Sequence, residues 1–257
     1  MSTGGFALLL AEQPHSFNKI LTLGTIVFIF DLVLFISFCI AIATRFAMNP
    51  SALRRSLTYP SEALFFPAFW LSWPTIIGCM NDYGVPHTGY WLIVVVRVLF
   101  WIYVACTLLT AIFQYWFLFT ARQLTVQSMA PNWILPIFPA MLSGTLASII
   151  ASAQPPSQRL PIIVAGVMLQ GLGMLVAMLM YAVLIARLME YGLPSPNLRP
   201  GLFICVGPPS FTALALIGMS NALPEGYGYF AKNPSAADAL RAMALFVGIF
   251  LWALAFW

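Results

Sequence analysis

Charged residues are scarce in this chain of 257 residues, at 7%, whereas soluble globular domains carry roughly 25%. Apolar residues make up 61% and the mean hydropathy is +0.93. A soluble fold of this length would lack the charge to cover its surface, so the composition predicts an integral membrane protein with the lipid bilayer as its surroundings. The net charge is only +4 and no basic run exceeds Arg54-Arg55, so we expect no nucleic-acid partner.

Cysteine pairs and catalytic motifs are also missing. The four cysteines lie in apolar runs without a CxxC spacing, which predicts neither a zinc site nor a disulfide framework; they are Cys39, Cys79, Cys106 and Cys205. The sequence holds no GxSxG, HExxH, Walker or dinucleotide-binding motif. We therefore expect a protein that is not an enzyme, with no catalytic residue, no metal and no cofactor.

Apolar runs of about 20 residues, the length that crosses a bilayer, recur along the chain. Seven are predicted, at residues 20–44, 60–80, 91–119, 132–153, 161–186, 201–222 and 238–257. Residues 1–11 form an apolar half-span and the last run has no polar tail, so we expect a sequence that is truncated at both ends. The prediction is an all-α polytopic membrane protein with eight segments in a single transporter domain, 1–257.

Lysine and arginine in the loops favour one orientation, because cytoplasmic loops hold an excess of both. One set of alternate loops contains Arg45, Arg54, Arg55, Arg122, Arg187 and Arg199. The other set contains Lys19, Arg159 and Lys232, with Arg241 near a helix start. We expect the first set to be cytoplasmic.

Proline is unevenly distributed among the segments. The third, fifth and seventh contain it, whereas the second, fourth and eighth have none and the sixth has only Pro161 at its start. Proline removes a backbone hydrogen bond and kinks a helix, and carbonyls freed within lipid must face protein or water. The alternation predicts tandem helical hairpins with kinked inner helices around a pore. The kinks are expected at Pro60, Pro67, Pro139, Pro208 and Pro209.

Hydroxyl side chains lie near these kinks, namely Ser72, Thr75, Ser143, Thr145, Ser148, Ser210 and Thr212. Together with freed backbone groups they are candidates to line an anion path. The alternative is helix packing, because small residues let membrane helices approach closely. Packing is the favoured interpretation for Gly166, Gly171 and Gly173 in the sixth segment.

Ionisable residues inside membrane segments are candidates for function. Asp31 lies midway along the second segment and Arg97 in the first third of the fourth, and we favour a structural ion pair between them. Glu62 lies at the start of the third segment. It either caps the helix N-terminus, where the helix dipole favours an acid, or binds a coupled proton.

Several motifs add a family resemblance. They are Ser2-Thr3-Gly4-Gly5, Tyr59-Pro60-Ser61-Glu62-Ala63-Leu64-Phe65, Phe138-Pro139 with Leu142-Ser143-Gly144-Thr145, and Gly192-Leu193-Pro194 with Arg199-Pro200-Gly201-Leu202-Phe203 and Val206-Gly207-Pro208-Pro209-Ser210-Phe211-Thr212. The motif in the seventh segment is the specific one. Over essentially its whole length the chain resembles the tellurite-resistance/dicarboxylate transporter family of the voltage-dependent anion channel superfamily, and within it the fungal malic acid transport proteins.

The resemblance implies ten helices in five tandem hairpins, often assembled as trimers, with the odd helices lining a pore for small anions. Thr3, Glu62 and Phe211 lie in its motifs and join the hydroxyl residues as pore-lining candidates. Two features depart from the family pattern. Tyr59 stands where the family usually has the histidine of His-Pro-x-Glu, and the ninth and tenth helices, with their pore-occluding phenylalanine, have no counterpart here.

The resemblance leads us to expect proton-coupled transport of malate and related C4-dicarboxylates by a homotrimer in the plasma membrane. Three alternatives remain open at this stage. They are a sulfite efflux carrier, a passive anion channel of the same fold, and a truncated fragment that does not transport.

Overall fold

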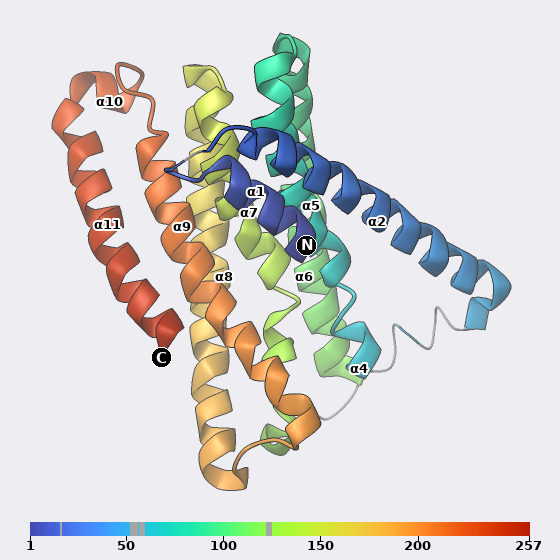
Figure 1. Ribbon diagram of the computed structural model, residues 1–257. Helices are drawn as coiled ribbons and strands as arrows, with labels where there is room; N and C mark the ends of the chain where they lie inside the picture. The colour runs from blue at the N-terminus through green and yellow to red at the C-terminus, as the bar shows by residue number, and fades with distance from the viewer. Residues whose placement is uncertain (16, 52–55, 57–59, 122–124) are drawn as a thin grey trace. The chain divides into compact units, whose positions relative to one another are not determined.

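The computed structural model describes residues 1–257 except 16, 52–55, 57–59 and 122–124, and the regular secondary structure in this described part is entirely helical (Figure 1). The all-α prediction is therefore confirmed. By internal contacts the chain divides into two compact units, Met1–Tyr103 and Val104–Trp257. Each unit is described by itself below.

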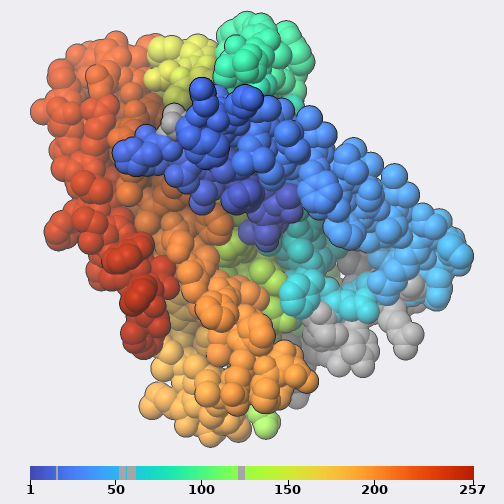
Figure 2. All heavy atoms as spheres, viewed as in Figure 1, coloured from blue at the N-terminus to red at the C-terminus, as the bar shows by residue number. Residues whose placement is uncertain are grey.

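The N-terminal unit is built around two helices that pack against α1. In order, its elements are α1 (Ser2–Ala11), α2 (Ile20–Met48), α4 (Pro60–Ala63), α5 (Ala68–Cys79), the π-helix η1 (Met80–Gly84), the 3-10 helix η2 (Val85–His87) and the first part of α6 (Tyr90–Ala121). α1 contacts both α2 and α5. α2 turns Ile20, Gly24 and Asp31 inward, while most of its other side chains are exposed, as in a helix that faces lipid. Figure 2 shows these outward side chains in blue.

The C-terminal unit is built around α7. Its elements are the rest of α6, the 3-10 helices η3 (Val126–Ser128) and η4 (Pro131–Ile134), α7 (Phe138–Ile150), the 3-10 helix η5 (Ala151–Ala153), α8 (Pro156–Tyr191), the 3-10 helix η6 (Pro196–Val206), α9 (Gly207–Asn221), α10 (Tyr229–Lys232) and α11 (Pro234–Phe256). α7 contacts α8 and α9, and α9 also contacts α11. Residues 138–147 of α7 are all buried.

Five helical stretches in the described residues are long and apolar enough to cross a bilayer. They are Ile20–Met48, Tyr90–Thr120, Pro156–Tyr191, Pro196–Asn221 and Pro234–Phe256. The predicted third and fifth segments contain shorter helices instead, since α5 has 12 residues and α7 has 13. A chain with five membrane-length helices is a polytopic membrane protein.

The prolines explain why the third and fifth segments are broken. Pro67 immediately precedes α5, Pro139 is the second residue of α7, and Pro208 and Pro209 are the second and third residues of α9. At these positions a proline costs no helical hydrogen bond inside its own helix, because the first N–H groups of a helix have no partner within it. The residues predicted as kinks therefore mark helix starts. Pro74 is different and lies inside α5.

Burial follows the predicted alternation only in part. The odd segment α7 is buried and the even helix α11 is mostly exposed, with Phe250 at 68%. The even helix α8 differs, because Gly166, Gln170 and Gly173 along it are buried. These glycines allow the close approach of α7: a Cβ atom built on Gly173 would lie 2.3 Å from Cβ of Met141.

Candidate functional site

The segment η6–α9, which changes from a 3-10 helix to an α-helix at Gly207, holds the most distinctive part of the site, in the C-terminal unit. Pro208 and Pro209 have no N–H, so the carbonyl of Cys205 loses its helical donor in either helix type, from Pro209 in an α-helix and from Pro208 in a 3-10 helix. The structure supplies a replacement, since the Tyr181 hydroxyl of α8 donates to this carbonyl oxygen at 2.7 Å. The Ile204 carbonyl oxygen accepts the N–H of Gly207. Both carbonyls are thus bonded within the protein.

One turn into α9, Thr212 forms a second connection to α8. Its Oγ1 donates to the carbonyl of Pro208 at 2.6 Å and accepts from Nε2 of Gln170 at 2.9 Å. Gln170 is 1% exposed and Thr212 6%. The Thr212 proton is therefore directed back to its own helix, so this hydroxyl offers no free donor to an anion.

The predicted hydroxyl residues of α7 lie beside α9. Thr145 Oγ1 donates weakly to the carbonyl of Phe211 at 3.4 Å, and Ser148 Oγ donates to the carbonyl of Thr145 at 2.7 Å. Ser148 also packs on Gly218, where an added Cβ would lie 2.6 Å from its own Cβ. Ser143 is fully buried and its Oγ has no hydrogen-bond partner among the described residues. α7 and α9 thus bring Ser148, Thr145 and Phe211 together.

Two other residues of α9 are more accessible. Ser210 is half-buried and its Oγ donates to the carbonyl of Val206 at 2.8 Å. Phe211 is half-buried and its ring meets Phe138 edge to face, with centroids 5.9 Å apart. Hydroxyls that donate to the preceding turn are common in membrane helices, and a rotation about χ1 releases the proton. Ser210 and Ser148 are therefore the partly exposed hydroxyls that can turn toward an anion.

In the N-terminal unit, Thr3 and Ser72 lie on the elements that surround Asp31. Both residues are half-buried. The carbonyl of Ser72 accepts from Thr75 Oγ1 at 2.9 Å. Gly4 follows Thr3 in α1, and a Cβ added to it would be 2.6 Å from Thr75 Oγ1 and 2.7 Å from Asp31 Oδ2. Only a glycine in this place lets α1 lie against these two polar side chains.

Asp31 does not form the ion pair that we expected with Arg97. It is 4% exposed, and no ion pair joins these two described residues. The physical reason is the rotation of α2, which directs Asp31 toward Gly4 of α1 and Thr75 of α5. Arg97 is half-buried on α6.

Glu62 lies in α4 and contacts two side chains. Its Oε2 accepts from Ser56 Oγ at 2.5 Å and lies 3.6 Å from Nη2 of Arg45. The Arg45 and Glu62 side chains are both more than half exposed, so this pair contributes little to stability. Pro60 begins α4, whereas Tyr59, the residue at the family's histidine position, lies outside the described residues.

Asp82 lies in η1, beyond the end of α5, and was not singled out from the sequence. Its Oδ1 accepts from Nδ2 of Asn81 at 3.0 Å. Burial raises the pKa of Asp82 from 3.8 to about 6, with a smaller rise from the charge of Glu12, while the Asn81 hydrogen bond lowers it. Asp82 therefore titrates close to neutral pH.

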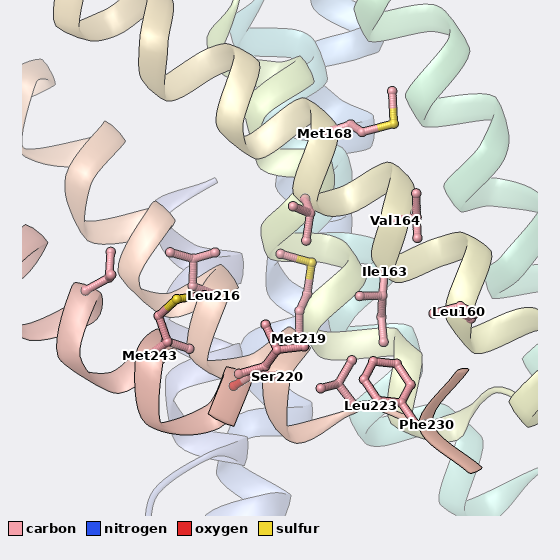
Figure 3. A pocket seen from close by; sticks show the side chains of 14 residues that line it. Leu160, Ile163, Val164, Met168, Leu216, Met219, Ser220, Leu223, Phe230 and Met243 are labelled. Carbon is pink, nitrogen blue, oxygen red and sulfur yellow. The ribbon is translucent and has the colours of Figure 1, made fainter. Parts of the chain in front are cut away.

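An apolar pocket elsewhere in the C-terminal unit does not suit an anion. It has a volume of about 380 Å³ and lies among α8, α9, α10 and α11 (Figure 3). Its walls are apolar side chains such as Met168, Met219 and Phe230, and Ser220 supplies the one hydroxyl. The Ser220 proton is donated to the carbonyl of Ile217 at 2.8 Å. A charged ligand here would be buried without a partner, which is strongly unfavourable.

Sequence reasoning missed Gln170 and Tyr181, because only the glycines of the sixth segment were singled out. A lone amide within an apolar run was the available signal, since polar side chains inside membrane helices usually face other helices. No group of three or more potential metal ligands occurs in the described residues. Apart from Glu62 on α4, the predicted residues lie on α1 and α5 in the N-terminal unit and on α7 and α9 in the C-terminal unit.

Comparison with known proteins finds similarity along the whole chain. A family model described as "Voltage-dependent anion channel" matches residues 1–257. A malic acid transport protein of Schizosaccharomyces pombe is 35% identical over 257 residues, which are 100% of this chain and 59% of that relative. A putative malic acid transport protein of the same yeast is 35% identical over 251 residues, which are 98% of this chain and 58% of the relative.

A more distant relative has a different name. A sulfite efflux pump of Arthroderma benhamiae is 24% identical over 262 residues, which cover 98% of this chain and 68% of that protein. The chain thus spans a little under three-fifths of the length of the two malic acid transport relatives. The relatives are named as transporters, whereas no name among them is that of an enzyme.

Proposed function

Because the chain belongs to the voltage-dependent anion channel family, we propose that it transports small organic anions across a membrane, with malate and related dicarboxylates as substrates. The observation that supports this most is the 35% identity to a malic acid transport protein over all 257 residues. The hydroxyl residues of α7 and α9 agree with an anion path, because Ser148 and Ser210 are partly exposed and can rotate to donate.

The mode of transport is part of the same proposal. A dicarboxylate crosses the membrane more readily when its negative charge is offset, so we propose that it is taken up together with protons. We also propose, from the family resemblance, that the protein is a homotrimer in the plasma membrane. Glu62 is the candidate proton site, because its carboxylate is exposed and held by Ser56 and Arg45.

Sulfite efflux is the second candidate function. It is favoured by the sulfite efflux pump that is 24% identical over 98% of this chain. Both functions use small oxyanions, and hydroxyl donors suit either one. We propose malate first because the malic acid transport relatives are more similar to this chain, at 35% identity.

Labelled malate uptake tests the proposal. The chain, and a version extended by its genomic flanks, are expressed in cells that lack malate uptake, and uptake is measured at acidic and neutral external pH with sulfite as competitor. We expect saturable uptake by the extended form that is faster at acidic pH. Glu62→Gln should reduce the effect of pH, whereas Glu190→Gln, at an exposed position, is the control and should retain it.

Three outcomes distinguish the alternatives. Resistance to sulfite without malate uptake would replace the malate proposal with sulfite efflux. Malate uptake at the same rate at acidic and neutral pH would support dicarboxylate transport and contradict proton coupling. If neither form transports either anion although both reach the membrane, the transport proposal is wrong.

A further inference from the structure

Two polar side chains of α8 meet the segment η6–α9 on either side of its prolines. Tyr181 bonds to Cys205, before the Pro208-Pro209 pair, and Gln170 bonds to Thr212, after it. Positions 170 and 181 differ by eleven residues, or about three turns of an α-helix, so they lie on one face of α8. The residue order is reversed between the two segments, because the later residue of α8, Tyr181, contacts the earlier residue of η6–α9, Cys205. The two contacts lie on either side of the change from 3-10 helix to α-helix.

The Tyr181 hydroxyl replaces the backbone donors that Pro208 and Pro209 lack. Because Pro208 and Pro209 together remove both possible helical donors to the Cys205 carbonyl, this oxygen would be unbonded in an apolar surrounding without the Tyr181 hydroxyl. Phenylalanine would fill the same space without the hydrogen bond. The hydroxyl therefore holds the last turn of η6 in a defined position.

The Gln170 contact reaches three helices. Its Nε2 donates to Thr212 of α9, while its side chain lies against Gly144 of α7, where an added Cβ would be 2.5 Å from Oε1 and 2.6 Å from Cβ of Gln170. Oε1 is buried and has no hydrogen-bond partner among the described residues. A methionine would pack between these helices without the cost of burying an amide. The amide instead holds the Thr212 side chain in one rotamer, through the hydrogen bond from Nε2 to Oγ1.

We propose that Gln170 and Tyr181 are positioning residues that hold η6 and α9 at the Pro208-Pro209 step, and that they thereby determine how the transporter discriminates between malate and sulfite. The inference rests on the proposed function. Ser210 lies between the two anchored residues, Cys205 and Thr212, so a shift of either anchor moves its hydroxyl. Dicarboxylate and sulfite differ in size and in the spacing of their oxygens, so the ratio of the two transport rates responds to that shift.

The first test measures this ratio in matched variants. Gln170→Met and Tyr181→Phe remove one hydrogen bond each and keep the volume. Their controls are Gln158→Met and Tyr191→Phe, at exposed positions near the two ends of α8. We expect the malate-to-sulfite ratio to change at least threefold in the first pair and to stay constant in the controls, at equal amounts of folded protein. Thr212→Val should shift the ratio as Gln170→Met does, with no further shift in the double variant.

A proportional loss of malate and sulfite transport that tracks the amount of folded protein, at a constant ratio, would show a merely structural role and overturn the proposal. A second measurement does not depend on transport. Cys205 is half-buried near the end of η6, so its thiol reports on the position of η6 once the other cysteines are replaced by alanine. We expect a membrane-permeant maleimide to modify Cys205 several-fold faster in Tyr181→Phe than in Tyr191→Phe.

The two measurements separate the two proposals. If the unmodified protein moves neither anion, the proposed function fails, and the positioning inference is then judged by Cys205 alone. An unchanged rate of Cys205 modification in Tyr181→Phe would overturn it. A changed rate with an unchanged malate-to-sulfite ratio would overturn the link to substrate discrimination.

Discussion

At the scale of single residues, the direction of each hydroxyl proton decides what a membrane helix can offer an anion. Ser148, Ser210 and Thr212 all donate to backbone carbonyls about one turn earlier in the chain. Thr212 also accepts from Gln170 and is buried, so its role is internal. Ser148 and Ser210 are partly exposed and can exchange a local hydrogen bond for one to a substrate. The same residue type thus serves packing at one position and is suited to binding at another.

Asp82 provides a prediction about pH. Its folded pKa of about 6 lies above the ordinary value of 3.8, so between these values the folded protein binds more protons at Asp82 than the unfolded chain does. Stability should therefore fall as the pH rises from about 4 to about 6. Asp82→Asn should remove this dependence and stabilise the protein at pH 7 by about 1–3 kcal/mol, with little effect at pH 4. Thermal unfolding in detergent across this range measures it.

The control for this prediction is Asp238→Asn, because the Asp238 side chain is 79% exposed. It should leave the slope of stability against pH unchanged. If Asp82→Asn retains the slope of the unmodified protein, the assignment of the titration to Asp82 is wrong.

At the scale of elements, the contact between α7 and α8 depends on where a glycine lies. Gly173 has Met141 of α7 directly against it, with 2.3 Å between a built Cβ and the Met141 Cβ, whereas Gly171 has nothing within 4 Å. Gly173→Ala should destabilise the protein by about 1–3 kcal/mol through overpacking. Gly171→Ala should be neutral, or stabilising by up to about 1 kcal/mol, because alanine is the better helix former.

Denaturant unfolding of the two alanine variants in the same detergent compares them directly. The variants differ by two positions on one helix and by the same added methyl group, so the comparison isolates packing against α7. Equal stability of both variants would mean that α7 does not lie against Gly173 as described.

At the scale of the whole molecule, the orientation in the membrane is a prediction from the loop charges alone. α8 has 36 residues and is about 54 Å long at 1.5 Å per residue, so its two ends lie on opposite sides of a bilayer. In a background with all four cysteines replaced by alanine, Ser157→Cys should react with an impermeant maleimide in intact cells. Ser195→Cys should react only after permeabilisation. Both positions are exposed, and the reverse pattern would invert the predicted topology.

The sequence by itself determined the class of this protein and most of its elements. Low charge and long apolar runs leave a polytopic helical membrane protein as the solution, because lipid requires every backbone group to be bonded within a helix or a closed barrel. The prolines were predicted to kink the third, fifth and seventh segments, and the structure places them at or next to helix starts instead, where a residue without an N–H costs no hydrogen bond. Close packing was predicted for Gly166, Gly171 and Gly173; the structure confirms it at Gly166 and Gly173, whereas a Cβ on Gly171 would have nothing within 4 Å.

Only the tertiary structure decided which groups meet. Periodicity shows that a residue is on a helix, but the rotation of that helix depends on its neighbours. The rotation of α2 therefore placed Asp31 against Gly4 and Thr75 instead of Arg97. In the same way, α8 was expected to pack through its glycines, and only the structure shows that it also supplies the donors for Cys205 and Thr212. A carbonyl freed by proline must be bonded in an apolar surrounding, and which side chain bonds to it is a property of the packed helices.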